Sequence, residues 1–304
     1  MDNHGFWVQR LRDVVKTTTF YSKYAGFGLL NEEQGNLAIA QRLRSEEPFL
    51  ALRAGATEMR CLAEHLHGGA HFSEKIRQDI SALSGVFSND DASLHRFCEV
   101  YHQAMLQADL LAVWDVGAER RVAGEMRRAG HTQFLRIRSL EPYYFARPWS
   151  EALAGKRVLV VHPFAQSIRS QYQRRSELFP GKTVLPEFAE LTVIPAVQSI
   201  AGEKPPFDTW FDALAFMQRR IDAADFEVAL IGAGAYGLPL AAYCRSLGKQ
   251  AIQTSGATQI LFGIKGRRWD DHPVIGKLYN DAWVRPAPSE TPKAQNVVEG
   301  GSYW

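Results

Sequence analysis

The chain has 304 residues, enough for two domains or one large one, and 46% of them are apolar and 22% charged. These values are ordinary for a globular protein and exclude a disordered tail, a collagen and an isolated coiled coil. The formal net charge of +2, from 35 basic and 33 acidic residues, argues against a nucleic-acid partner. Three widely spaced cysteines without a CxxC motif predict reduced thiols in a cytoplasmic protein and not a zinc site.

The sequence shows no signal peptide and no apolar segment typical of a membrane span. The first residues, MDNHGFWVQRLRD, contain no apolar run of the kind found in a signal peptide. The most apolar window, 228–244, contains three glycines and a proline and is therefore typical of a buried strand and helix. We expect a cytoplasmic protein without a membrane span, with a peripheral position at the inner face of the membrane as an option.

The first 150 residues predict a helical arm followed by an α/β half. Residues 1–34 mix aromatic and charged side chains and predict a helical N-terminal arm. In the first α/β half, 35–150, short apolar runs bounded by turn residues predict strands at 49–53, 110–116 and 133–138. Apolar positions at helical spacing predict helices at 36–44, 58–66, 75–83, 92–108 and 118–129, with a short helix from Pro148.

The second α/β half, 151–304, alternates strands and helices more regularly. The predicted strands are 157–163, 191–197, 228–231 and 250–253, and the predicted helices are 167–175, 207–223 and 238–247. Pro195 interrupts the second of these strands and favours an edge position for it. The alternation predicts an α/β, Rossmann-like fold, a mostly parallel sheet with helices on both faces. No linker rich in proline, glycine or serine separates the halves, so one continuous domain is an alternative.

A glycine-rich turn follows the predicted strand at 228–231. Gly232, Gly234 and Gly237 match the G-x-G-x-x-G pattern, in which glycines let the backbone approach a phosphate. A dinucleotide site also needs an acidic residue near the end of the next strand, where it binds the ribose. Residues 228–269 contain no Asp or Glu, which argues against NAD and less strongly against NADP. A tight turn without a ligand is the structural alternative.

The near-neutral net charge hides two basic segments. Residues 152–176 and 228–269 contain five cations each and no acid, so the rest of the chain carries a charge of −8. Both segments contain predicted strand-to-helix turns, where open α/β sheets bind ligands. The two segments therefore predict one focused pocket for an anionic ligand, although cations solvated at the surface would give the same count.

Several residues in the two basic segments suit an anionic ligand that contains a sugar. His162 ends a predicted strand, where it would serve as an acid or base, contact a phosphate, or be purely structural. Ser167 is a predicted helix cap beside Gln166, at a helix start whose N–H groups can bind phosphate. The candidates after the 250–253 strand are the turn residue Gly256, the sugar- or base-binding Thr258 and Gln259, and the phosphate-binding Lys265 and Arg268.

An acidic residue follows the first predicted strand. In the stretch Leu52-Arg53-Ala54-Gly55-Ala56-Thr57-Glu58, Thr57 is the predicted N-cap of the helix and Glu58 falls in the first turn. Carboxylates favour helix starts for electrostatic reasons alone, so a capping role is the structural alternative to a role in catalysis.

Two of these stretches resemble the GT-D type glycosyltransferases of bacterial surface-polysaccharide synthesis. Residues 52–58 resemble the early strand that ends in an R-x-G-D-G-E pattern in this family. Residues 230–256 resemble the late strand, glycine turn, helix and strand ending in a glycine. The order and spacing of the two stretches agree with the family over about residues 35 to 270.

The resemblance implies a Rossmann-like fold and transfer of a sugar from a nucleotide-diphosphate sugar to a glycan or lipid-linked glycan, as in capsule synthesis. In the family, an aspartate and a glutamate two residues later help to bind a divalent metal. Here Glu58 matches the glutamate but Ala56 replaces the aspartate, so dependence on Mn²⁺ or Mg²⁺ stays open and no metal ligand is assigned. The cations of the basic segments would then neutralise the diphosphate, and Glu58 would serve as a general base or residual metal ligand.

The resulting prediction is a glycosyltransferase with Glu58 and His162 as catalytic residues. The residues predicted to bind the nucleotide sugar are Arg53, Gly55, Thr57, Gln166, Ser167, Gly232, Gly234, Gly237, Gly256, Thr258, Gln259, Lys265 and Arg268. Two alternatives remain: an NADP-linked oxidoreductase or dinucleotide-binding protein, and a non-catalytic scaffold that binds sugar nucleotides. The aromatic tail, 297–304, is predicted to dock on the body or cover the cleft.

Overall fold

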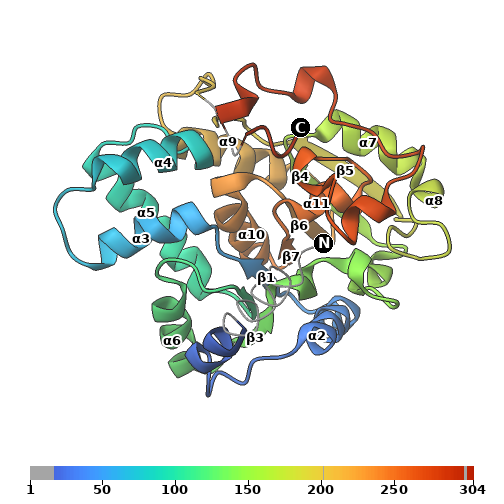
Figure 1. Ribbon diagram of the computed structural model, residues 1–304, viewed down its shortest axis with the longest axis horizontal. Helices are drawn as coiled ribbons and strands as arrows, with labels where there is room; N and C mark the ends of the chain where they lie inside the picture. The colour runs from blue at the N-terminus through green and yellow to red at the C-terminus, as the bar shows by residue number, and fades with distance from the viewer. Residues whose placement is uncertain (1–16, 201, 298–299) are drawn as a thin grey trace, which may run out of the picture.

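The computed structural model describes residues 17–200, 202–297 and 300–304 (Figure 1). The predicted arm of 1–34 therefore lies only partly within the described residues. Within that part, residues 17–23 are helical and Leu30 forms an isolated parallel bridge with Leu135 of the sheet. The described part of the arm thus attaches to one edge of the sheet.

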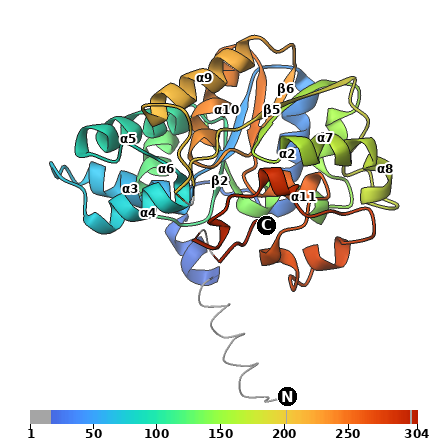
Figure 2. The same ribbon diagram turned by 90° about the horizontal axis from the view of Figure 1, so that it is seen from above.

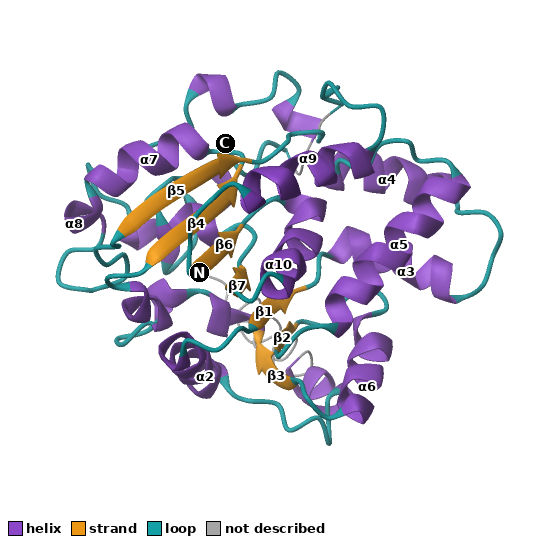
Figure 3. Cartoon of the chain, turned by 180° about the vertical axis from the view of Figure 1, so that it is seen from behind, coloured by secondary structure: helices purple, strands orange, loops and turns teal. Residues whose placement is uncertain are grey.

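Seven strands form one sheet in the order β3-β2-β1-β7-β6-β4-β5 (Figure 3). The strands are β1 (Leu50–Arg53), β2 (Leu110–Val113), β3 (Gln133–Arg136), β4 (Arg157–His162), β5 (Glu190–Pro195), β6 (Val228–Ile231) and β7 (Gln250–Gln253). Neighbouring strands are parallel, and central ones such as β2 and β6 are buried throughout, so their sequences are wholly apolar. The predicted α/β fold is confirmed, and β5 is an edge strand as predicted.

Helices cover both faces of the sheet, and an apolar core fills each interface (Figure 2). The first face carries α3 (Ala56–Leu66), α4 (Glu74–Ser84), α5 (Asp91–Leu106), α6 (Glu119–Ala129), α9 (Trp210–Asp222) and α10 (Gly237–Ser246). The second face carries α2 (Glu32–Ser45), α7 (Ala165–Gln173), α8 (Arg175–Leu178) and α11 (Ala257–Leu261). Among the described helices, none combines the length and the apolar composition that a membrane crossing requires.

Short 3-10 helices complete the connections. They are η1 (Ile137–Leu140), η2 (Pro142–Tyr144), η3 (Trp149–Leu153), η4 (Gly234–Tyr236), η5 (Arg267–Trp269), η6 (Ile275–Leu278), η7 (Pro288–Glu290) and η8 (Gln295–Val297). The first two follow directly on β3, so the strand predicted for 133–138 ends two residues early. The last two belong to the C-terminal segment, which runs beside α7 and α11 (Figure 1).

The two halves of the chain share the sheet, because β1 of the first half pairs with β7 of the second. The chain leaves β1 and β6 toward α3 and α10 on the first face, and it leaves β7 and β4 toward α11 and α7 on the second face. Connections that diverge from neighbouring strands open a crevice at the carboxyl edge of a sheet, where α/β proteins bind ligands. The topology therefore directs attention to the carboxyl ends of β1, β7, β6 and β4.

Two predicted helix caps are wrong. Gly55, and not Thr57, is the N-cap of α3, because the backbone is still extended at Gly55 and Thr57 already lies in the first turn. Phe164, and not Ser167, precedes α7. The Ser167 hydroxyl donates instead to the carboxylate of Glu290, a partner from near the C-terminus.

Candidate functional site

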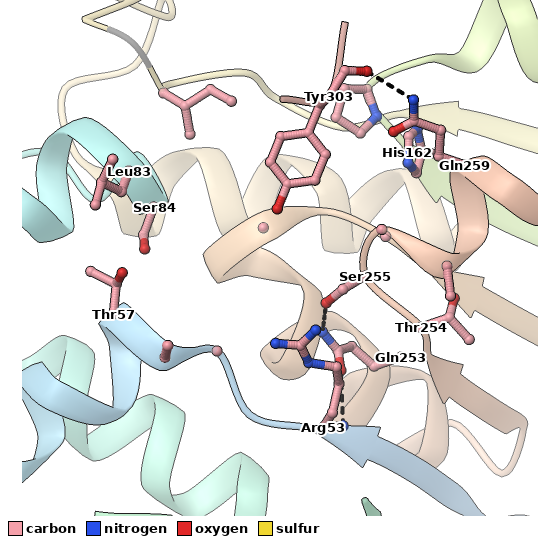
Figure 4. Close-up of a pocket in the computed structure, with 18 of the residues that line it drawn as sticks. Arg53, Thr57, Leu83, Ser84, His162, Gln253, Thr254, Ser255, Gln259 and Tyr303 are labelled. Atoms are coloured by element: carbon pink, nitrogen blue, oxygen red, sulfur yellow. Dashed lines mark hydrogen bonds between the residues drawn. The ribbon is translucent and has the colours of Figure 1, made fainter. Parts of the chain in front are cut away.

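A cavity of about 320 Å³ lies over the carboxyl ends of the central strands (Figure 4). Figure 4 shows Thr57 and Ser84 on one side of it, His162 and Gln259 on the other, and Arg53 and Tyr303 at opposite ends. The predicted site residues that line it are Arg53, Gly55, Thr57, Glu58, His162, Gly232, Gly234, Gly256, Gln259 and Arg268. Most of the predicted residues thus lie in one place, although they come from both halves of the chain.

Arg53, the last residue of β1, brings a half-buried cation to the cavity. Its guanidinium carbon lies 4.4 Å from the ring centre of Trp114, whose indole N–H donates to the Ala54 carbonyl at 2.9 Å. The backbone N–H of Arg53 donates to Oε1 of Gln253 at 3.0 Å, which ties the end of β1 to the end of β7. The guanidinium is therefore held on an aromatic face beside the cavity, where it can pair with a phosphate.

Glu58 is buried in the first turn of α3, with 7% of its surface exposed. Its carboxylate turns back toward the helix start, because a Cβ placed on Gly55 would lie only 2.0 Å from Oε2. The N–H of Gly55 donates to the Tyr101 hydroxyl at 2.9 Å, which fixes this turn. Burial raises the pKa of Glu58, and contacts with Ser84 and the charge of Arg53 partly oppose the rise. A carboxyl with a raised pKa exchanges its proton closer to neutral pH.

His162 ends β4 with its imidazole buried against the cavity. Its Nδ1 accepts the backbone N–H of Phe164 at 3.0 Å, so the hydrogen bond assigns the ring proton to Nε2. Burial lowers the pKa of His162 to about 3, which keeps the ring neutral at physiological pH. The geometry favours a neutral hydrogen-bond donor at this position over an acid that works as imidazolium.

The glycine turn after β6 contributes two of its three glycines to the cavity. A Cβ on Gly232 would lie 2.6 Å from Cδ2 of His162 and 2.8 Å from the Ser255 carbonyl oxygen, so no side chain fits there. Gly234 has a φ of +53°, a left-handed conformation that glycine adopts without strain. Gly237 begins α10 and lies against Gln253 instead of lining the cavity, so it packs the helix on the sheet.

The predicted phosphate site at the start of α7 already holds an anion of the protein itself. The Glu290 carboxylate accepts the backbone N–H of Gln166 at 2.6 Å and that of Ser167 at 3.2 Å. Glu290 is buried and belongs to η7. Gln166 and Ser167, which were predicted to contact the nucleotide sugar, lie outside the cavity lining, and the carboxylate of Glu290 occupies the N–H groups at their helix start.

The remaining predicted residues follow β7. Gln259 lines the cavity while its Nε2 donates to the carbonyls of Lys265 at 3.0 Å and Tyr303 at 2.8 Å. Arg268 lies at the rim, with its guanidinium carbon 5.2 Å from the ring centre of Tyr303. Thr258 and Lys265 lie outside the lining. The first pairs its hydroxyl with Thr254 at 2.5 Å, and the second packs over Tyr279.

Some residues that line the cavity were not predicted from the sequence. Trp114 and Glu141 follow β2 and β3, so extending the search to the ends of those strands would have found them. Burial raises the pKa of Glu141 to about 7, against the opposing charges of Arg138 and Arg53. Ser84 and Tyr101 lie on helices and carry no local signal. The predicted docking of the tail is seen for its last two residues, Tyr303 and Trp304, which line the cavity.

The residues at the cavity do not fit the divalent metal that the resemblance implies. Within the described residues, no group of three or more His, Cys, Asp or Glu side chains is arranged to hold a metal, and the acids lining the cavity are Glu58 and Glu141. Ala56 stands where the family has its aspartate, so Glu58 lacks the acidic neighbour two residues earlier that would complete the pair. Mg²⁺ and Mn²⁺ prefer several charged oxygen ligands, which this donor set does not supply.

Comparisons with known proteins find distant likenesses in structure. No protein-family model matches the chain, and no curated protein matches it. The fold is similar to a selenomethionine-substituted structure of domain of unknown function 1792, with 13% identity and a TM-score of 0.44 over 87% of this chain and 92% of that one. A second structure, described as domain of unknown function 1792 with a distinct glycosyltransferase fold, gives 13% identity and a TM-score of 0.46 over 90% and 96%. Likenesses at this level do not assign a function.

Proposed function

We propose that the chain is a glycosyltransferase that takes its sugar from a nucleotide-diphosphate sugar. The observation that carries this proposal is the meeting of Arg53, Glu58 and the glycine turn in one cavity at the carboxyl edge of the sheet. The two stretches that resemble the GT-D enzymes are far apart in the sequence, and pairing of β1 with β7 brings them together. A fixed cation can offset the negative charge of a leaving diphosphate, and a buried carboxylate can accept the proton of an acceptor hydroxyl.

The binding roles follow from the chemistry of each residue. Arg53 places a fixed positive charge where the diphosphate of the donor would lie, and this charge offsets the negative charge that develops as the diphosphate leaves. His162 offers a neutral N–H donor to a phosphate or sugar oxygen. Gly232 lets His162, Thr258 and Ser255 pack against its backbone, and this close packing holds His162 in its place at the cavity wall.

Glu58 is the residue proposed to act on the acceptor. In its ionised form it takes the proton from an acceptor hydroxyl, and the hydroxyl oxygen then forms a bond to the anomeric carbon of the sugar. The bond from that carbon to the diphosphate breaks, and its electron pair leaves with the diphosphate. The acceptor in this proposal is a glycan or lipid-linked glycan of a bacterial surface polysaccharide, and the reaction takes place in the cytoplasm or at the inner face of the membrane.

The test combines ligand binding with turnover. Thermal unfolding is measured with a panel of UDP-, GDP- and dTDP-sugars, and release of nucleoside diphosphate is then followed with the sugar that raises the melting temperature. We expect Glu58→Gln to keep the thermal shift and to lower turnover about 10²- to 10⁴-fold. The matched control is Glu74→Gln, which alters an exposed glutamate in the first turn of α4 and is expected to keep full turnover.

Three outcomes would contradict the proposal. If no nucleotide sugar raises the melting temperature, the cavity does not bind a donor. Binding without turnover by the unaltered protein would favour a sugar-nucleotide-binding scaffold. Binding of NADPH that sugar nucleotides do not displace would favour the dinucleotide alternative, although β7 ends at Gln253 and is followed by Thr254 and Ser255, not by an acid or arginine.

A further inference from the structure

The last residues of the chain form a wall of the cavity. Tyr303 and Trp304 both line it, and Figure 4 shows the Tyr303 ring projecting into it from the end opposite Arg53, with Ser255 between them. Tyr303 is half-buried as a whole and lines the cavity. A ligand held by Arg53 would therefore extend toward this ring.

Hydrogen bonds to backbone carbonyls fix the position of this wall. The Gln259 side chain donates to the Tyr303 carbonyl at 2.8 Å, and the backbone N–H of Arg268 donates to the Ser302 carbonyl at 3.0 Å. The N–H of Arg267 donates to the Trp304 carbonyl at 3.3 Å. Because these bonds join the C-terminal residues to α11 and to η5, the backbone of Tyr303 has a set position relative to the end of β7.

Two aromatic rings and a guanidinium group surround Tyr303. Its ring centre lies 6.3 Å from that of Trp269 in an edge-on arrangement, and the Arg268 guanidinium carbon lies 5.2 Å from it. A Cβ on Gly256 would lie 3.5 Å from Cε1 of Tyr303 and 3.3 Å from the Trp269 ring, so the missing side chain lets both rings approach the turn after β7. Such a wall suits a planar aromatic group, which gains stacking energy against rings and guanidinium groups.

We propose that Tyr303 provides a stacking face for the nucleobase of the donor. This proposal rests on the proposed function, which supplies the class of ligand, a nucleotide sugar. It adds that the wall formed by Tyr303 recognises the base of that ligand. Within a nucleotide sugar the charge resides on the diphosphate, which Arg53 attracts, and the base is the only planar aromatic part. The base therefore packs against Tyr303 while the diphosphate lies toward Arg53 at the other end of the cavity.

The experiment compares ligands with and without a base. Isothermal calorimetry measures the binding of the nucleoside diphosphate of the best donor and of inorganic pyrophosphate, to the unaltered chain and to Tyr303→Ala, Tyr303→Leu and Tyr303→Phe. Loss of one stacked base partner corresponds to about 5- to 150-fold in affinity. We expect the alanine and leucine variants to lose this much for the nucleoside diphosphate and little for pyrophosphate, and the phenylalanine variant to stay within about twofold.

Controls separate this proposal from the proposed function and from damage to the fold. Tyr21→Ala removes a tyrosine side chain from a position that is 48% exposed and does not line the cavity. This variant is expected to keep its affinity for the nucleoside diphosphate and for pyrophosphate. Nucleoside diphosphate binding that stays unchanged in Tyr303→Leu, or a loss equal for both ligands, would overturn the stacking role alone. Failure of the unaltered chain to bind any nucleotide would overturn the proposed function, and the stacking role with it. Melting temperatures of all variants exclude unfolding as the cause.

Discussion

Burial decides the chemistry of His162. The ring ends a strand, where the sequence predicted an acid, a base or a phosphate contact. In the structure its Nδ1 accepts a backbone N–H from Phe164, and the surrounding protein excludes the water that would stabilise an imidazolium. A neutral ring with its proton on Nε2 therefore holds the cavity wall in one protonation state across the physiological range.

This neutrality predicts a pH dependence of stability. The unfolded histidine titrates near pH 6.5 and the folded one at about 3, so between these values the unfolded state binds more protons. The contribution of His162 is therefore complete above pH 6.5 and is lost as the pH falls toward 3, by about 1.4 kcal/mol per pH unit. Denaturant unfolding should show the unaltered chain losing about 0.7 kcal/mol relative to His162→Asn from pH 7 to 6 and about 1.2 kcal/mol from pH 6 to 5.

The comparison with a variant is necessary because other groups act in the opposite direction. Glu141, whose pKa is raised to about 7, favours the folded state increasingly as the pH falls. His67→Asn, at the exposed end of α3, is the matched control. A stability difference between unaltered chain and His162→Asn that does not change with pH would show that the ring titrates normally.

The same strand-end reasoning explains how much of the site the sequence could predict. Arg53 and His162 end strands, Gly232 follows β6 directly, and Glu58 lies in the first turn of the helix after β1. Parallel strands deliver such residues to one edge of the sheet. Ser84 was not predicted as a site residue, because it lies at the end of a helix and its position at the cavity depends on how α4 packs. Residues brought in by packing have no signature in the sequence around them.

At the scale of elements, the contact of Glu290 in η7 with Gln166 and Ser167 at the start of α7 differs most from the sequence prediction. This contact is called the junction of η7 with α7. The start of α7 was predicted to bind a phosphate, and an anion is indeed present, but it is the carboxylate of Glu290. The partners Ser167 and Glu290 are separated by 123 residues, so no local pattern could have joined them. Periodicity predicted most helices and strands within a few residues, whereas this contact between distant elements required the structure.

The junction predicts a stability effect for Glu290→Gln. The carboxylate accepts the backbone N–H groups of Gln166, Ser167 and Ala287 and the Ser167 hydroxyl at the positive end of a helix. Loss of its charge should therefore destabilise the fold by about 2 kcal/mol. Denaturant unfolding measures this loss, and hydrogen exchange should show faster opening of residues 287–297. Glu33→Gln, an exposed acid in the first turn of α2, is the control and is expected to cost less than about 0.5 kcal/mol. A Glu290 variant as stable as this control would contradict the role of the junction.

At the scale of the whole molecule, one sheet joins the two halves of the chain. The central strands β1 and β7 come from opposite halves, and both apolar cores contain residues from each half. The sequence predicted the alternation of strands and helices in both halves. It left open whether the halves were separate, because strand order is decided by which edges meet and not by any local pattern.

The shared sheet predicts a single cooperative unfolding transition. Leu52→Ala in β1 and Leu230→Ala in β6 each empty a fully buried position, which typically costs about 2–5 kcal/mol. We expect both variants to shift the same transition, with circular dichroism and tryptophan fluorescence giving coincident curves. Leu37→Ala, at a position 44% exposed, should leave it nearly unchanged. Two separate transitions, with each leucine variant moving only one, would mean that the halves unfold independently.

The pairing of β1 with β7 also determines when the sheet can form during synthesis of the chain. Leu50 pairs with Ala251, about 200 residues later, so at ordinary rates of synthesis the partner strand arrives roughly 10 to 40 s after β1. During that interval β1 can pair with β2 on one side, while its other edge is a template for any strand that it meets. The growing polypeptide is therefore most exposed to aggregation on the ribosome, before the central strand of its sheet has been made.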